Sequence, residues 1–171
     1  MPYTPRHRLS RRRQHTRSLQ HDEHHWSVYV PAPHDPVVVA GFGDAVVLAG
    51  ELAEFGVDRE AVVLLDARRR VCAILLDPPP EVGLLVGLLD LPGLDSQFCQ
   101  TLCIAFASHV EVGPLTDDDR RGYLALRRAH MAQGLLLIDV LECDGDTVRS
   151  LAIGCDPDPV WFDEFDPLED D

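Results

Sequence analysis

Two glycines and a later acidic residue form the first pattern in the chain that could do chemistry. Gly41 and Gly43 follow an apolar run and precede a predicted helix, and Asp66 ends another apolar run 25 residues after Gly41. Such spacing is typical of dinucleotide-binding folds, where glycines let a pyrophosphate approach a helix N-terminus. Here Val46 occupies the third glycine position, and Asp44 places a negative charge where the phosphate would lie. The pattern therefore disfavours a nucleotide site.

The cysteines and clustered histidines predict no metal centre of their own. The chain has five cysteines and no C-x-x-C pair, so we expect no disulfide framework and a cytoplasmic location. Cys99 and Cys103 lie in an apolar stretch and are expected to be core residues. His21, His24 and His25 could chelate a metal, but they fall in a segment for which we expect disorder.

Charge is distributed unevenly along a chain whose formal net charge is −14. Residues 1–34 hold six arginines and few apolar side chains, which predicts a disordered basic tail and at most a weak arm for nucleic acid. The acidic remainder argues against broad nucleic-acid binding, because phosphate contacts need a positive surface. Residues 156–171 are expected to form a disordered, acidic and aromatic tail that could dock in a basic apolar groove. No apolar run is long enough to span a membrane.

Residues 35–155 are predicted to form one α/β domain, a mixed β-sheet flanked by helices. Alternating and continuous apolar runs predict the strands, while apolar residues three and four apart, with glycine or proline at the ends, predict the helices. The expected elements are a helix capped by Asp44 and ending at Phe55, a hairpin of Ala61–Asp66 and Val71–Leu76, a helix over 81–89, a strand over Thr101–Ala107, and two last strands over Leu135–Leu141 and Thr147–Ile153.

The clearest local signal lies before the helix that is expected to end at Gly134. Thr116 is a good N-cap residue, and Asp119 stands three positions later, close to a capping box. Asp117 and Asp118 complement the positive end of the helix dipole.

The stretch from Asp58 to Leu151 resembles the RadC branch of the JAB/MPN (JAMM) family. Residues 58–66 are similar to the family's strand E-x-F-x-x-x-x-L-D, and residues 114–119 to P-x-S-x-x-D. Residues 134–140 are similar to G-I-P-L-L-D-H, and Ser150 stands at the family's late serine. The ordered set carries the resemblance, since no one motif in it is specific.

This resemblance implies a cytidine-deaminase-like three-layer α-β-α fold and, by association, DNA repair. It also implies a metal site, usually zinc, written H-x-H-x₇-S-x-x-D. In that site two histidines and the aspartate hold the ion, a glutamate on the first strand is the general base, and the serine stabilises the oxyanion. Residue by residue, Asp58 falls on the glutamate position, with Glu60 on the same strand face as a substitute. Thr116 falls on the serine and Asp119 on the aspartate.

The histidine positions are where the sequence departs from the family. The first falls on Ala107 or Phe106, and the second falls on Ser108, or on His109 if one residue is deleted. The resemblance then leaves His109 and Asp119 as metal ligands, with Glu111 as a third candidate.

Two functions follow from that reduced set. The first is a non-catalytic module that acts by binding a protein partner, with a homo-oligomer as a further expectation and no cofactor. The alternative is a zinc-dependent amide or isopeptide hydrolase, a metallopeptidase-like enzyme, with Asp58 or Glu60 as base and Thr116 as oxyanion donor. Helix capping explains Thr116 and Asp119 without any metal.

Overall fold

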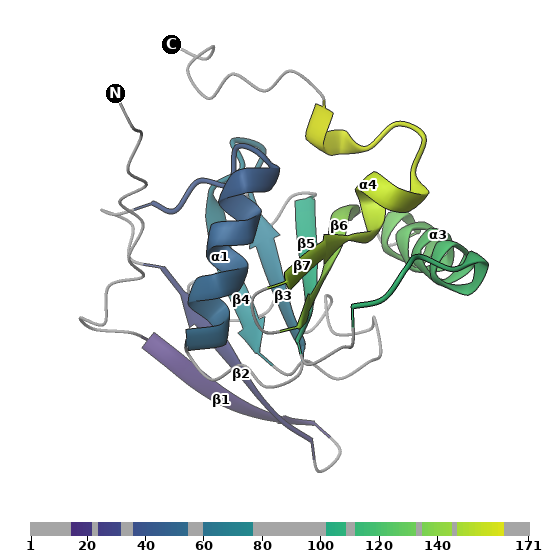
Figure 1. The fold of residues 1–171 in the computed structure, drawn as a ribbon. Coiled ribbons are helices and arrows are strands. Elements are labelled where there is room, and N and C mark those ends of the chain that lie inside the picture. The colour runs from purple at the N-terminus through teal and green to yellow at the C-terminus, as the bar shows by residue number, and fades with distance from the viewer. Residues whose placement is uncertain are drawn as a thin grey trace.

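Seven strands of the computed structural model form one mixed β-sheet, with the order β1-β2-β4-β3-β5-β6-β7 (Figure 1). The strands are β1 (His15–His21), β2 (His24–Val30), β3 (Glu60–Leu65), β4 (Val71–Leu76), β5 (Leu102–Ser108), β6 (Leu136–Asp144) and β7 (Thr147–Ser150). The helices are α1 (Phe42–Glu54), α3 (Asp117–Met131), the short α4 (Leu151–Cys155) and the 3-10 turn η1 (Val160–Phe162). The structure describes residues 15–21, 24–31, 36–54, 60–76, 102–108, 112–132, 135–144 and 147–162.

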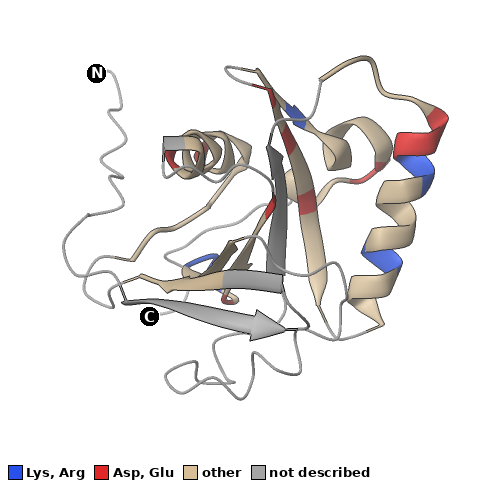
Figure 2. Ribbon diagram, turned by 90° about the horizontal axis from the view of Figure 1, so that it is seen from below, with Lys and Arg blue, Asp and Glu red and all other residues tan. Residues whose placement is uncertain are grey.

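The sheet is antiparallel except between β5 and β6, which are parallel. Parallel neighbours need a crossover connection, and α3 lies in the chain between them. Figures 1 and 2 show α1 against one face of the sheet and α3 against the other. The predicted mixed sheet flanked by helices is therefore confirmed.

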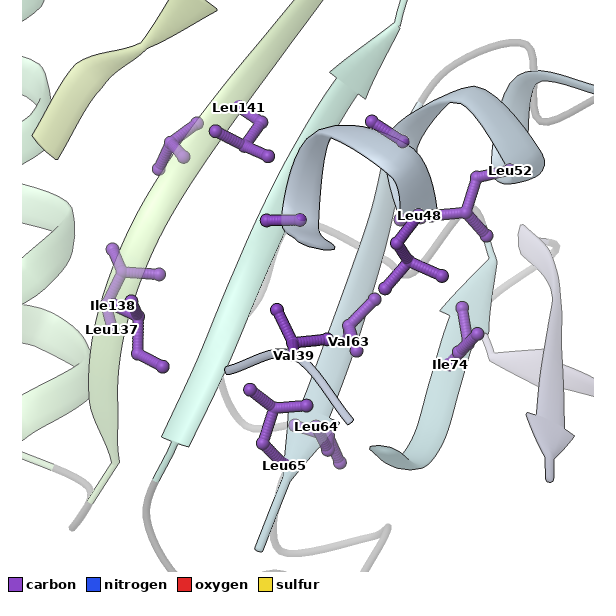
Figure 3. Close-up of a cluster of buried hydrophobic side chains, with 14 of the residues drawn as sticks. Val39, Leu48, Leu52, Val63, Leu64, Leu65, Ile74, Leu137, Ile138 and Leu141 are labelled. Carbon is purple, nitrogen blue, oxygen red and sulfur yellow. The ribbon is translucent and has the colours of Figure 1, made fainter. Parts of the chain in front are cut away.

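The core lies between α1 and the sheet and continues around β6 (Figure 3). Helix α1 buries Ala45, Leu48, Ala49 and Leu52, whose spacing of three and four residues forms one apolar stripe. Leu48 and Leu52 point toward Val63 and Ile74 of the sheet (Figure 3). Strand β6 is buried on both faces over residues 137–141, and Leu137, Ile138 and Leu141 are fully buried.

The turn between β3 and β4 confirms the predicted hairpin. The Asp66 carboxylate accepts hydrogen bonds from the backbone N–H groups of Arg68 and Arg70, both at 2.9 Å, and so closes the turn. Arg69 has a φ of 55°, in the left-handed region that favours glycine. Its side chain is buried, and its guanidinium donates to the backbone carbonyls of Ala40 at 2.5 Å and Val160 at 3.4 Å.

Three predicted element boundaries are wrong, and one of them is the end of β6, which continues past the predicted Leu141 to Asp144. Residues 151–153 form the start of α4 and not the end of a strand, because the Ser150 hydroxyl caps a helix by accepting from the backbone N–H of Ile153. A short apolar run fits a strand or a helix equally, so the cap decides. Asp44 lies inside α1, where its Oδ2 accepts from the backbone N–H groups of Ala40 and Gly41. That internal carboxylate occupies the helix N-terminus that a nucleotide phosphate would need.

Both predicted tails contain ordered structure. Within the segment expected to be disordered, β1 and β2 form an antiparallel hairpin, and β2 pairs with β4 through Ser27–Tyr29. Val28 of β2 is buried, so this strand supplies apolar contact that the polar composition around it conceals. At the other end, η1 orders part of the acidic tail.

Several predictions fall outside the described residues: the helix over 81–89, Cys99, and the remainders of both tails. Cys103 lies in β5. Among the helices that the structure describes, none combines the length and the apolar character needed to cross a membrane.

Candidate functional site

The sheet brings two of the predicted segments together. Strand β5 runs antiparallel beside β3, and Glu60 pairs with Ala107, one residue before the end of β5. Glu60 is exposed. Because it is opposite Ala107, it lies at the end of the strands where the chain leaves β5 toward α3. Asp58, His109 and Glu111 lie outside the described residues, and the predicted convergence of a base with metal ligands stays a prediction.

Thr116 and Asp119 bind each other at the start of α3. The Thr116 hydroxyl accepts from the Asp119 backbone N–H at 3.2 Å, and Asp119 Oδ2 accepts from the Thr116 N–H at 2.8 Å and from its hydroxyl at 3.0 Å. The predicted capping box is confirmed. These hydrogen bonds, the backbone one first, lower the pKa of Asp119, and the charge of Arg149 lowers it further. Both side chains are therefore already engaged in holding the helix end.

The described residues do not supply a metal-ligand set. Within them, no three His, Cys, Asp or Glu side chains are grouped so that they could hold an ion. Of the three candidate ligands only Asp119 is among these residues, and its Oδ2 serves the helix cap.

The most buried polar group of the described chain is Asp139, in the middle of β6. Its side chain has no solvent exposure, and four donors converge on its carboxylate. Oδ2 accepts from the Ser150 hydroxyl at 2.5 Å and from Trp161 Nε1 at 2.6 Å. Oδ1 accepts from the backbone N–H groups of Val140 at 2.7 Å and Ala152 at 2.9 Å. We call Asp139, Ser150 and Trp161 the Asp139 cluster.

Burial and hydrogen bonding act on Asp139 in opposite directions. Burial raises the pKa of the Asp139 carboxyl above its ordinary range. The four hydrogen-bond donors lower this pKa, Ser150 most, but they do not cancel the effect of burial. Nearby, burial raises the pKa of Tyr123 to about 12, with the Asp139 charge as the second cause. Tyr123 therefore keeps its proton at neutral pH.

The Asp139 cluster ties the end of the described chain to the sheet. We call residues 156–162 the C-terminal strap. The Trp161 ring is buried and packs edge-on against Phe42 of α1, with the ring centroids 6.2 Å apart. The Arg69 guanidinium lies over the same ring at 6.0 Å, an arrangement that attracts a cation to the aromatic face. The strap begins at Asp156, which forms an ion pair with Arg127 of α3.

The Asp139 cluster has a structural role. Ser150 is 8% exposed, and its hydroxyl donates to Asp139 while accepting from the N-terminus of α4. A serine nucleophile needs access to a substrate and a base that takes its proton. Burial denies Ser150 that access, so the cluster holds β7, α4 and the strap in one arrangement.

Part of this cluster could be anticipated and part could not. Asp139 interrupts an apolar strand, and a buried carboxylate must find donors, so its sequence context signals a polar partner. Nothing local names Trp161 as that partner, because it follows 22 residues later. The expectation that the aromatic tail docks in a basic apolar groove of a partner stays a prediction; within the chain, the Arg69 guanidinium lies 6.0 Å from the centroid of the Trp161 ring.

When the chain is compared with models of known families, with curated proteins and with solved structures, none of the three yields a match.

Proposed function

We propose that this chain is a non-catalytic JAB/MPN-like module of the RadC type that acts by binding a protein partner. The observation that carries the proposal is the capping box at α3. Thr116 keeps a hydroxyl at the family's serine position and Asp119 keeps the aspartate, and the two residues hydrogen-bond to each other. In this chain they stabilise a helix end, a role that needs no ion.

The order of elements supports the family part of the proposal. Strand β5 lies beside β3 and leads along the chain to α3, the order that the family motifs follow. Asp139 and Ser150, which align with the family's late aspartate and serine, are in direct contact at 2.5 Å. Asp139 and Ser150 belong to separate motifs of the resemblance, and their contact supports taking these motifs together.

The free edge of the sheet supports the binding part. Strand β1 ends the strand order on one side and is seven residues long, and no described strand pairs with its outer side. On the other side β7 has four residues and runs directly into α4. An unpaired edge is a template for a strand from another chain, a partner protein or a second copy.

The alternative is the metal-dependent hydrolase, and the position of Glu60 favours it. Glu60 is exposed beside the end of β5, from which a general base could reach a metal-bound water. The ligands would be His109 and Asp119, with Glu111 as a third, and Thr116 would be the oxyanion donor. For this function the Thr116–Asp119 cap would have to open.

Metal content separates the two functions. The full chain purified without chelator is measured by elemental analysis beside His109→Ala and Asp119→Asn. The proposal expects well under one zinc per chain in all three proteins. One zinc per chain that either substitution removes would establish the hydrolase instead.

Hydrogen exchange of residues 15–21 tests the binding edge. If β1 binds a second copy, its amides should become protected as the protein concentration rises, while those of β6 stay unchanged because they already lie inside the sheet. Protection that is independent of concentration, and unaltered by cell extract, would contradict binding through this edge.

A further inference from the structure

The C-terminal strap is fastened to the rest of the protein at two points. At its start Asp156 forms an ion pair with Arg127 of α3. Near its end Trp161 donates a hydrogen bond to the Asp139 carboxylate at 2.6 Å, and the indole ring is buried. Both fastenings are made by side chains, and each joins the strap to an element distant from it in the sequence.

The first four residues of the strap form a hinge with few backbone hydrogen bonds. The N–H of Asp156 donates to the Ala152 carbonyl of α4 at 2.8 Å, and that of Asp158 donates to the Asp156 side chain at 3.1 Å. Pro157 and Pro159 have no backbone N–H. The hinge therefore donates no backbone hydrogen bond to the sheet, and Pro157 and Asp158 are exposed. A segment held mainly by a few side chains opens at a lower free energy than the core.

The place that Trp161 occupies is built by residues outside the strap, which we call the tryptophan seat: Phe42, Arg69 and Asp139. The Asp139 carboxylate accepts three other hydrogen bonds, from β6, β7 and α4. The Arg69 guanidinium, which lies over the ring, donates to the Ala40 carbonyl at 2.5 Å. These contacts do not need the strap. The seat therefore offers a buried acceptor, an aromatic edge and a cation to an indole that arrives with its N–H inward.

From the exposed hinge and the separately built seat, we propose that two copies of the chain exchange their C-terminal straps, so that each Trp161 enters the seat of the other copy. The second copy fits this seat because its strap carries the same aspartate and tryptophan at the same separation. Every contact that the strap makes within one chain can then be made between two. The stretch from Asp156 to Trp161 spans at most about 20 Å when extended. The two copies must therefore meet at the end of the molecule where α4 lies (Figure 1).

The proposed exchange is independent of the proposed function. It uses neither the free edge of β1 nor the helix cap of Thr116 and Asp119. A dimer formed through β1 would survive the loss of Trp161, whereas a dimer formed by strap exchange would not.

Shortening the hinge tests the exchange. Deletion of Pro157 and Asp158 removes two exposed residues and about 7 Å of reach, so the strap can enter its own seat only by unwinding η1. The seat of a second copy can still be placed within reach. Sedimentation velocity should show the unaltered protein gaining dimer as its concentration rises, and the shortened chain as a dimer at every concentration measured.

Two substitutions in the shortened chain identify the contact that holds its dimer. Trp161→Ala should return it to a monomer, because the strap loses its fastening in the seat. Ile153→Ala is the matched control, since Ile153 is exposed on α4 beside the hinge and lies outside the seat, and the dimer should remain. A dimer that survives Trp161→Ala, or that Ile153→Ala dissociates, would overturn the proposal. A shortened chain that is folded and monomeric would overturn it as well.

A mixture of two full-length variants gives a second measurement that does not depend on the shortened chain. Trp161→Ala keeps the seat and lacks the indole, while Asp139→Asn keeps the indole and has a weakened seat. Native mass spectrometry of the mixture should show a heterodimer that exceeds either homodimer. Free indole should dissociate it by filling the empty seat, and 1-methylindole, which has no N–H to donate, should not. A mixture without a heterodimer, or one that both compounds affect equally, would contradict strap exchange.

Discussion

Replacing Trp161 by phenylalanine should destabilise the protein chiefly through one hydrogen bond. Trp161 Nε1 donates at 2.6 Å to the Asp139 carboxylate, which has no solvent exposure. A hydrogen bond to a charged group contributes about 1.5–3 kcal/mol, and phenylalanine retains most of the ring. For a chain of this size that loss corresponds to a Tm lower by about 3–12 °C.

A double-mutant cycle isolates the interaction from the altered packing. Trp161→Phe, Asp139→Asn and the double variant are unfolded in urea near neutral pH and followed by far-UV circular dichroism, which does not depend on tryptophan emission. Because the two side chains touch, the coupling energy should exceed about 1 kcal/mol. Phe42→Leu is the matched control, since Phe42 contacts the Trp161 ring and not the carboxylate. Its coupling to Asp139→Asn should be small. Additive effects of Trp161→Phe and Asp139→Asn would refute the reasoning.

Three further predictions concern the cap, the buried acid and the turn. Thr116→Ala should cost about 1 kcal/mol through loss of the α3 cap, and Thr116→Ser should recover most of it in thermal unfolding. Because burial raises the pKa of Asp139, the folded protein holds that proton more tightly than the unfolded chain. The free energy of unfolding should therefore fall as the pH rises from about 3.9 through the raised value, and Asp139→Asn should remove this part of a pH titration of stability. Arg69→Gly should relax the backbone yet lower the Tm, because the carbonyls of Ala40 and Val160 lose a donor; an unchanged or higher Tm would contradict this.

Local signals explain the parts of the fold that the sequence predicts well. The capping box before α3 and the polar turn between β3 and β4 depend on residues a few positions apart. The continuous apolar runs of β3 and β4, which predict the hairpin, are equally local. These elements need no knowledge of distant contacts, and their predicted boundaries differ from the structure by only a residue or so.

Distant contacts explain the rest. The ordering of β2 depends on pairing with β4, nearly fifty residues further along, and composition does not reveal such a partner. The acidic composition around Trp161 likewise gives no indication that its ring is buried and that its N–H has a hydrogen-bond partner. The resemblance alone suggests the candidate metal ligands. In the structure Asp119 caps α3, because its carboxylate accepts a hydrogen bond from the Thr116 N–H at 2.8 Å.

A crystal structure determined with stoichiometric zinc tests the central claim most directly. If Thr116 and Asp119 are a helix cap, Asp119 Oδ2 should remain about 3.0 Å from the Thr116 hydroxyl, with no ion bound to it. An ion held jointly by Asp119 and His109, with that hydrogen bond broken, would contradict the account.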